Sequence, residues 1–158
     1  MACKDRGRDF MRGKTGGLNK LTWFVLFLLT LQYIFGIIAN LYVTIPYAVI
    51  SPARTWSGLW VTLNWSLAHS PPILAAHAGT GVLLVLITCA GAVRAFFMKG
   101  MVWRSAYTAG LLILLFAGYN GVMFLISHGA NVYSMWMSFA YIAVLAVFFG
   151  ALYTAKRI

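Results

Sequence analysis

Acidic residues are almost missing from this sequence. Of its 158 residues only Asp5 and Asp9 carry a carboxylate, and both lie near the N-terminus. The chain therefore cannot supply paired carboxylates for acid–base catalysis, a Ser-His-Asp triad or a carboxylate relay through a membrane. It also has no G-x-x-x-x-G-K or G-x-G-x-x-G nucleotide loop. These absences argue against hydrolytic and nucleotide-dependent chemistry, and they remove most of the usual machinery of ion-coupled transport.

Cysteine and proline are also scarce. The two cysteines, Cys3 and Cys89, are far apart in sequence, and neither has a second cysteine at metal-ligand spacing. We therefore predict no disulfide and no thiolate metal site. All four prolines fall in or at the end of one connecting segment, at Pro46, Pro52, Pro71 and Pro72. No apolar stretch has an internal proline, so no proline kink is expected.

What the chain has in abundance is apolar sequence. Hydrophobic residues make up 62% and charged residues only 9% of the composition, which excludes a soluble globular domain. Four apolar stretches, 21–41, 72–93, 106–126 and 133–153, are each long enough to cross a hydrocarbon core of about 30 Å. The sequence predicts an all-α integral membrane protein, a four-helix transmembrane bundle that forms a single domain over residues 1–158.

The basic residues divide unequally between the two sides of such a bundle. Eleven of the twelve precede the first stretch, lie between the second and third, or follow the fourth: Lys4, Arg6, Arg8, Arg12, Lys14, Lys20, Arg94, Lys99, Arg104, Lys156 and Arg157. Only Arg54 falls on the other side. By the positive-inside rule both termini are cytoplasmic, as in a multi-pass protein of the cell membrane. We expect residues 1–20 to form a disordered basic cytoplasmic tail, with specific binding of anionic lipid as the alternative.

The outer loop, residues 42–71, contains a candidate helix. Ser51-Pro52 has the residue types of an N-cap and first helical position. Apolar residues then recur at spacings of three and four, at Trp56, Leu59, Trp60, Leu63 and Leu67. We predict a short amphipathic helix that lies on the outer interface and ends before the Pro71-Pro72 pair.

Tryptophans and small residues mark the ends and the contacts of the stretches. Two tryptophans fall at inner ends and four on the outer side, as in interfacial aromatic belts: Trp23 and Trp103 inside, Trp56, Trp60, Trp65 and Trp136 outside. Small residues align along the second and third stretches, at Gly81, Thr88 and Gly91 and at Gly110, Ala117 and Gly121. Such stripes predict close helix packing in lipid.

The three histidines, His69, His77 and His128, are the candidate ligands, and all lie at or near the outer face. His77 and His128 continue the small-residue stripes, so they are expected to face inward and to be able to hold a haem b. From the helix rise, however, they differ in height by roughly 10 Å, whereas two axial nitrogens are about 4 Å apart. His69 matches the height of His128 better, and these two with His77 beneath them could bind copper or zinc.

Structural roles compete with each of these ligand assignments. The imidazole of His77 can bond to a backbone carbonyl or to Gln32, Asn64 or Asn120 on other helices. Gln32 and Asn120 are themselves intramembrane amides, which commonly form interhelical contacts. Three methionines could complete a soft-metal site but more often fill gaps in packing: Met123, Met135 and Met137.

Leu31-Gln32 with Gly36 and Asn40, followed by His77 on the next stretch, resembles one four-helix half of the haem A synthases. That family binds haem between outer-side histidines, and the resemblance covers about two stretches. The chain departs from the pattern because Ala78 stands where the family has a basic residue. It also lacks the family's nearby glutamate and its pair of cysteines in the outer loop, so membership is not inferred.

Three functions remain open from sequence alone. The first is a non-catalytic accessory or stabilising subunit of a larger membrane-embedded redox complex, such as a terminal oxidase or a membrane copper monooxygenase. The second is a b-type haem electron carrier with His77 and an outer-face histidine as ligands. The third is copper or zinc binding by His69, His77 and His128. The expected partners are the lipid bilayer and other membrane subunits, and no nucleic acid.

Overall fold

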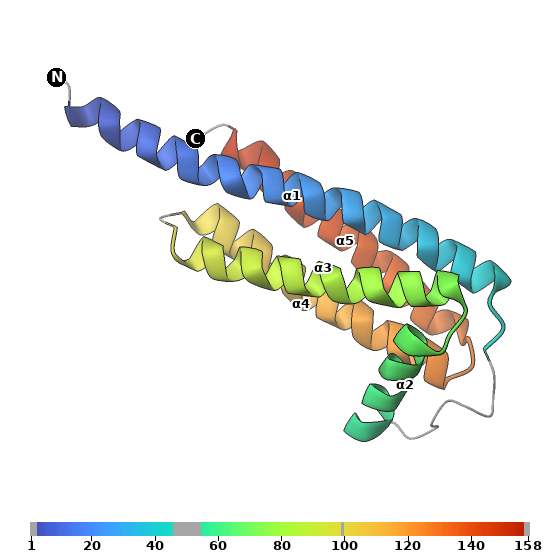
Figure 1. Ribbon diagram of the computed structural model, residues 1–158. Coiled ribbons are helices and arrows are strands. Elements are labelled where there is room, and N and C mark those ends of the chain that lie inside the picture. Colours follow the sequence, from blue (N-terminus) through green and yellow to red (C-terminus); the bar gives the residue numbers. More distant parts are fainter. Residues whose placement is uncertain (1–2, 46–54, 99, 157–158) are drawn as a thin grey trace.

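The computed structural model describes residues 3–45, 55–98 and 100–156, with side chains from residue 17 onward, and this part of the chain is helical (Figure 1). Its five helices are α1 Cys3–Tyr42, α2 Trp56–Ala68, α3 Pro72–Phe96, α4 Met101–Ile126 and α5 Asn131–Ala155. Four long apolar helices can cross a membrane: the Gly17–Tyr42 part of α1, and α3, α4 and α5, each of 25 or 26 residues. At 1.5 Å per residue such a helix is about 38 Å long. The four predicted stretches are therefore confirmed as helices, each longer than predicted, although α3 begins and α4 ends at the predicted residue.

The four long helices pack in a closed ring. Helix α1 contacts α3 and α5, α3 contacts α4, and α4 contacts α5, while α2 packs on α3 and α4. The start of α1, the α3–α4 connection and the end of α5 lie together at one end, here termed the basic end. Helix α2 lies at the other end, termed the α2 end, where it is steeply inclined to the long helices and projects to one side of the bundle (Figure 1).

The disorder expected for residues 1–20 is wrong for the part that the structure describes. Helix α1 already begins at Cys3, and Leu18 is fully buried in the core. Once a long apolar helix exists, each further residue adds one hydrogen bond without a new nucleation cost, and Lys and Arg are good helix formers. The packed part of the chain therefore begins near Gly17, several residues before the apolar stretch.

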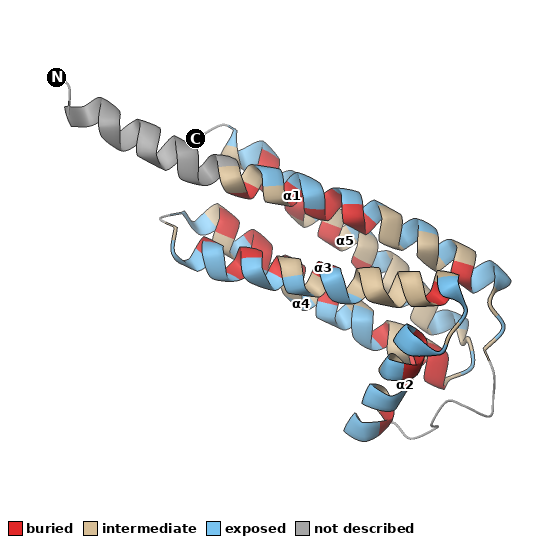
Figure 2. Cartoon of the chain, in the orientation of Figure 1, coloured by how far each residue is buried: buried red, intermediate tan, exposed pale blue. Residues whose placement is uncertain are grey.

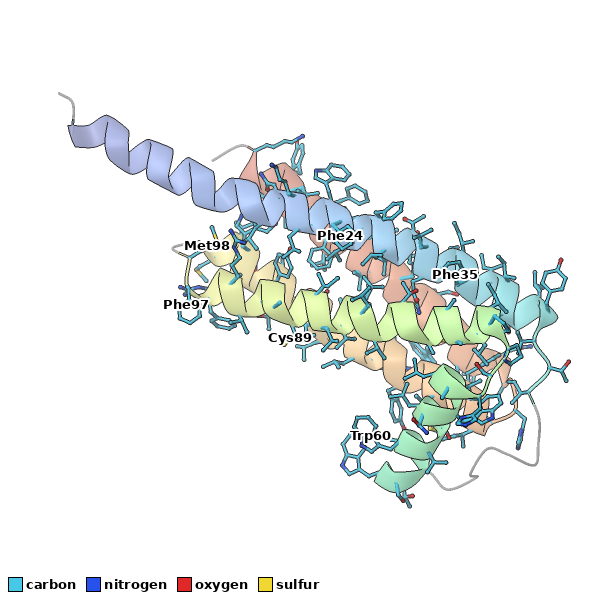
Figure 3. The ribbon with its side chains drawn as sticks, viewed as in Figure 1. Phe24, Phe35, Trp60, Cys89, Phe97 and Met98 are labelled. Carbon is cyan, nitrogen blue, oxygen red and sulfur yellow. The ribbon has the colours of Figure 1, made fainter. Side chains whose placement is uncertain are left out.

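Helix α2 begins later than predicted and packs on the bundle through mostly small residues. Residues 51 and 52 lie outside the described part of the chain. The described helix has Thr55 as N-cap, and its hydroxyl accepts a hydrogen bond from the Gly58 amide at 3.3 Å. The buried residues are mostly small, namely Gly58, Thr62, Trp65 and Ser66. The apolar stripe predicted for the interfacial helix is largely exposed, and Trp60 lies on this exposed side of α2 (Figure 3).

The tryptophans also separate into two kinds. Trp23, Trp56, Trp60 and Trp136 are exposed, but Trp65 and Trp103 are buried. The assignment of all six to interfacial belts is therefore wrong for these two, because their rings fill the bundle. Trp103 packs beside Tyr107, with ring centroids 6.3 Å apart, and Trp65 belongs to the cluster that joins α2 to the long helices.

Tyr107 is central to the half of the hydrophobic core that lies toward the basic end. Its ring is fully buried, lies over Gly91 of α3 and meets the Phe148 ring of α5 edge-on at 5.2 Å. Its hydroxyl donates to Oγ1 of Thr22 on α1 at 2.9 Å, because Thr22 uses its own hydrogen on the Leu18 carbonyl at 2.8 Å. A single side chain of α4 thus contacts the other three long helices.

The buried apolar residues form two clusters along the bundle (Figure 2). The larger one surrounds Tyr107 and extends to Leu84 and Leu29 near the middle of the bundle. The smaller one lies at the α2 end and consists of Ala39, Trp65, Leu74, Met123, Leu125 and Ile126. Between the two clusters lies a more polar layer, and this layer holds the candidate site.

Candidate functional site

The candidate site is a pair of polar side chains, Gln32 on α1 and His77 on α3. Along α1, Gln32 lies between Leu29 of the larger cluster and Ala39 of the smaller one. Along α3, His77 has a similar place between the two clusters. Both side chains are half-buried. The pair therefore lies within the length of two helices that can cross a membrane, where polar groups without partners are costly.

Two hydrogen bonds join His77 to Gln32, and together they define the state of the imidazole. Nδ1 of His77 lies 3.0 Å from the backbone carbonyl oxygen of Gln32. A carbonyl can only accept, so Nδ1 carries the hydrogen and donates it. In the neutral ring Nε2 is then an acceptor, and it receives a bond from the side-chain amide nitrogen of Gln32 at 3.3 Å. Both ring nitrogens are thus engaged by one residue of α1.

Two glycines make the approach possible. A Cβ at Gly36, one turn after Gln32, would lie 2.9 Å from Cε1 of His77. A Cβ at Gly81, one turn after His77, would lie 3.0 Å from Nε2 of Gln32. Each polar side chain therefore lies against a glycine of the opposite helix. Small residues at such crossings let helix backbones approach closely, as the stripe containing Gly81 led us to expect.

One polar atom of the pair is left over. Oε1 of Gln32 is buried and has no hydrogen-bond partner among the described residues. The amide nitrogen has to face the acceptor Nε2 of His77, so the oxygen is turned away from the ring. This orientation follows from the hydrogen bond to the carbonyl, because that bond determines which ring nitrogen is protonated.

This arrangement supports a structural role for the pair, which joins α1 to α3 by hydrogen bonds. A ligand role for His77 would require Nε2 to leave the Gln32 amide, since the other nitrogen is held by the carbonyl. The bond from Nδ1 to a carbonyl is also one that metal-binding histidines commonly make with the nitrogen that does not bind metal. In this structure both nitrogens of the imidazole take part in interhelical hydrogen bonds.

His128 does not lie where the helical stripe placed it. Helix α4 ends at Ile126, and His128 follows the C-cap Ser127 with a left-handed φ of 55°. The His128 amide donates to the Leu125 carbonyl at 3.0 Å, and the Gly129 amide to the Phe124 carbonyl at 2.8 Å. These two bonds form a Schellman motif that ends the helix. The inward orientation expected for His128 is therefore wrong, and its side chain is exposed.

His69 and Asn64 belong to α2 and its C-terminal end. His69 is the C-cap of that helix, and both side chains are exposed. With Val61 and Trp65 they line an open hollow of about 340 Å³. Across the described part of the chain, which includes all three histidines, no three His, Cys, Asp or Glu side chains gather closely enough to hold a metal ion.

Asn120 and the other candidates have local roles. Asn120 is buried on α4, and its amide donates to the Phe116 carbonyl of the same helix at 2.8 Å. Met123 is buried in the smaller cluster, Met135 is exposed, and the sulfur of Met137 lies 3.4 Å from the Cβ position of Gly121. Cys89 is a free thiol on the exposed face of α3 (Figure 3).

Sequence reasoning named Gln32 and His77 but not the part that Gly36 plays between them. The signal was present, because Gly36 follows Gln32 by four residues and so lies on the same face of its helix. The buried face of α2 was missed as well, although Gly58, Thr62 and Ser66 repeat every four residues. Small residues at that spacing are a packing signal in membrane helices.

No protein-family model, curated protein or solved structure matches the chain. Its function has to be inferred from its own residues.

Proposed function

We propose that this membrane protein is a non-catalytic accessory subunit that stabilises a larger membrane-embedded complex. The observation that carries the proposal is a groove between α4 and α5 that is lined almost entirely by small side chains. Its walls are Val102, Ser105, Ala106, Ala109, Ala146, Val147, Gly150, Ala151 and Thr154. The volume is about 420 Å³, against about 30 Å³ for one water in the liquid. The groove is shallow and open to the surroundings, so a neighbouring helix can approach α4 and α5 along it.

The spacing of the groove residues is the one that membrane helices use to pack against one another. Ala146, Gly150 and Thr154 follow at intervals of four on α5, and Ser105 and Ala109 do so on α4. In lipid, where apolar surface gains nothing from leaving the solvent, helices associate through close backbone approach at such small residues. A partner helix seated here would contact both α4 and α5.

Contacts within the chain do not require a glycine at position 150. At Gly91 and Gly110 an added Cβ would overlap the rings of Tyr107 and Phe148, so internal packing explains both glycines. At Gly150 an added Cβ would meet nothing within 4 Å. A glycine inside a helix costs about 1 kcal/mol relative to alanine. Gly118 is equally open, but only Gly150 lies among the small residues of the groove, and this position favours a role in contacts outside the chain.

The class of complex that we favour is a redox complex, such as a terminal oxidase or a membrane copper monooxygenase. With two acidic residues in the whole sequence, the chain has few groups for acid–base catalysis of its own. The resemblance of Gln32, Gly36 and His77 to the haem A synthases favours partners that carry out redox reactions. The engagement of both His77 nitrogens by Gln32 supports a stabilising role over a ligand role for this residue.

The proposed orientation has both termini in the cytoplasm and α2 at the outer surface of the cell membrane. Eleven of the twelve basic residues lie on the side of the two termini and one lies on the other side, and this distribution supports the orientation. At the α2 end, the exposed Trp56 and Trp60 are suited to the interface between lipid and water. Helix α2 would then lie on the outer interface, with Gly58, Thr62 and Ser66 against the bundle.

The test uses two glycines that differ only in their relation to the groove. Gly150 and Gly118 both lie within long helices, and an added Cβ at either meets nothing within 4 Å. Only Gly150 lines the groove. The chain is tagged and purified from its native membrane in mild detergent as wild type, Gly150→Leu and Gly118→Leu, and the copurified membrane proteins are identified.

We expect wild type and Gly118→Leu to retain the same partner subunits and Gly150→Leu to lose them, while all three show the same helical circular dichroism. A wild-type chain that runs alone would contradict the accessory role. Equal retention by the two leucine variants would reject the groove as the contact.

A further inference from the structure

A second surface, at the basic end, has a chemistry that the proposed function does not use. Each of the four long helices brings one described basic side chain to this end: Lys20, Arg94, Arg104 and Lys156. The only carboxylates are Asp5 and Asp9, in the part of α1 whose side chains are not described. Along the helix, Asp9 is about 16 Å before Lys20. Among the described side chains these four cations have no acidic partner.

Arg104 is occupied within the chain. Its guanidinium donates to the carbonyls of Ala95, Phe96 and Met98 at 3.4, 2.8 and 3.0 Å. These carbonyls belong to the last turn of α3 and to the residues just after it, where acceptors lack helical partners. Arg104 therefore caps α3 from the first turn of α4, and most of its N–H donors are used in this contact.

Arg94 is an exposed residue of α3 whose guanidinium lies against α1. It lies in the last turn of α3, and its guanidinium rests on the backbone of α1 at Gly17, where an added Cβ would overlap it. The side chain is exposed overall. The guanidinium therefore lies at the junction of α1 and α3. Its planar donors also match the oxygens of a phosphate.

Lys20 is the described basic side chain of α1 nearest to Gly17 along the helix. It follows Gly17 by three residues, so it lies about one turn along the same side of α1, and it is exposed. The backbone of α1 thus presents Lys20 close to the point where Arg94 crosses. Further along α1, away from the bundle, the sequence adds five more basic residues, Lys4, Arg6, Arg8, Arg12 and Lys14.

We propose that Arg94 and Lys20 bind the phosphate of an anionic phospholipid at the junction of α1 and α3. The end of a transmembrane bundle lies at the depth of lipid headgroups, and anionic lipids are the abundant anions there. Arg94 supplies a planar guanidinium that can donate two parallel hydrogen bonds, and Lys20 supplies an ammonium on a flexible side chain. The bound lipid would stabilise the contact between α1 and α3 at the end opposite to the Gln32–His77 pair.

The experiment measures phosphatidylglycerol bound to the full chain in a neutral detergent by native mass spectrometry, with phosphatidylcholine as the competing lipid. Arg94→Gln is compared with Lys156→Gln, which removes one exposed charge from the same end but away from α3. We expect Arg94→Gln to weaken phosphatidylglycerol binding at least about fivefold, the effect of one charge near a membrane surface. Lys156→Gln should leave binding near the wild-type value.

A second variant tests the position of the guanidinium without changing any charge. Gly17→Ala places a methyl group where the Arg94 guanidinium lies, so binding should fall although the net charge is the same. This variant and Lys20→Gln also decide the matter if Arg94→Gln does not fold. Added inorganic phosphate should not displace the lipid.

Three results would overturn the proposal. Equal losses in Arg94→Gln and Lys156→Gln would mean that only the net charge matters. Wild-type binding by both Arg94→Gln and Gly17→Ala would show that no lipid phosphate lies there. Displacement of phosphatidylglycerol by millimolar inorganic phosphate would assign the site to the free anion instead.

Discussion

Gly36 offers a direct test of the contact between α1 and α3. Replacing it with alanine would place a Cβ 2.9 Å from Cε1 and 3.3 Å from Nδ1 of His77. Carbon atoms prefer separations of about 3.5 to 4.0 Å, so the imidazole would have to retreat by roughly 0.6 to 1 Å. The bond from Nδ1 to the Gln32 carbonyl is already 3.0 Å long, and a retreat of that size takes it beyond hydrogen-bond distance.

The expected free-energy change has two parts of opposite sign. Alanine stabilises a helix interior by about 1 kcal/mol relative to glycine. Overpacking costs about 1 to 3 kcal/mol, which includes the loss of a membrane hydrogen bond of about 0.6 kcal/mol. The matched control is Gly118→Ala, because a Cβ at Gly118 meets nothing within 4 Å. Gly36→Ala should therefore be less stable than Gly118→Ala by about 1 to 3 kcal/mol.

The assay is unfolding by denaturant in mixed micelles, followed by tryptophan fluorescence. Both alanine variants are also made in a His77→Ala background, where the ring that causes the overlap is gone. There Gly36→Ala should lose its penalty and behave like Gly118→Ala. The reasoning fails if the two variants are equally stable with His77 present, or if the penalty of Gly36→Ala persists without the imidazole.

Two further predictions concern the α2 end and the orientation of the chain. His128 has a φ of 55°, a conformation that costs most residues about 1 to 2 kcal/mol but is easy for glycine; His128→Gly should therefore unfold at higher denaturant than His128→Ala, and the reverse order would contradict a left-handed C′ position. For the orientation, a fluorescent protein fused after Ile158 should fluoresce while alkaline phosphatase fused there stays inactive, and active phosphatase would invert the proposed topology.

The four spans could be predicted because they depend on length and composition alone. A run of about 20 apolar residues is stable across a bilayer only as a helix, whatever its neighbours are. The bounds were less predictable at the basic end. Arg94 and Arg104 lie within α3 and α4, since basic side chains can reach the headgroups from inside a helix and the helix need not end where the charge begins.

The faces of the helices were harder to predict than their positions. The apolar stripe of α2 predicted a helix on the outer interface, but it did not show which side of that helix would face the bundle. In a membrane protein apolar residues are equally stable against lipid, so the small residues Gly58, Thr62 and Ser66 decide which side packs. For His128 the height estimate assumed a continuous helix, and the turn after Ile126 made that assumption wrong.

The choice of partner for His77 depended on the tertiary structure. The sequence allowed four kinds of partner, namely a backbone carbonyl, Gln32, Asn64 or Asn120. Sequence alone does not distinguish between them. The relative rotation and height of α1 and α3 bring Gln32 to both ring nitrogens, whereas Asn64 is exposed on α2 and Asn120 bonds within α4.

The sequence by itself determined that the chain forms four apolar helices long enough to cross a membrane, because the bilayer constrains each stretch independently of the others. The tertiary structure decided which glycines face a side chain, which tryptophans are buried, and that Gln32 rather than a second histidine meets His77. Those outcomes depend on how rigid helices rotate and slide against one another. A few contacts between small and polar side chains that are distant in sequence determine this rotation and height, and hydrophobicity does not.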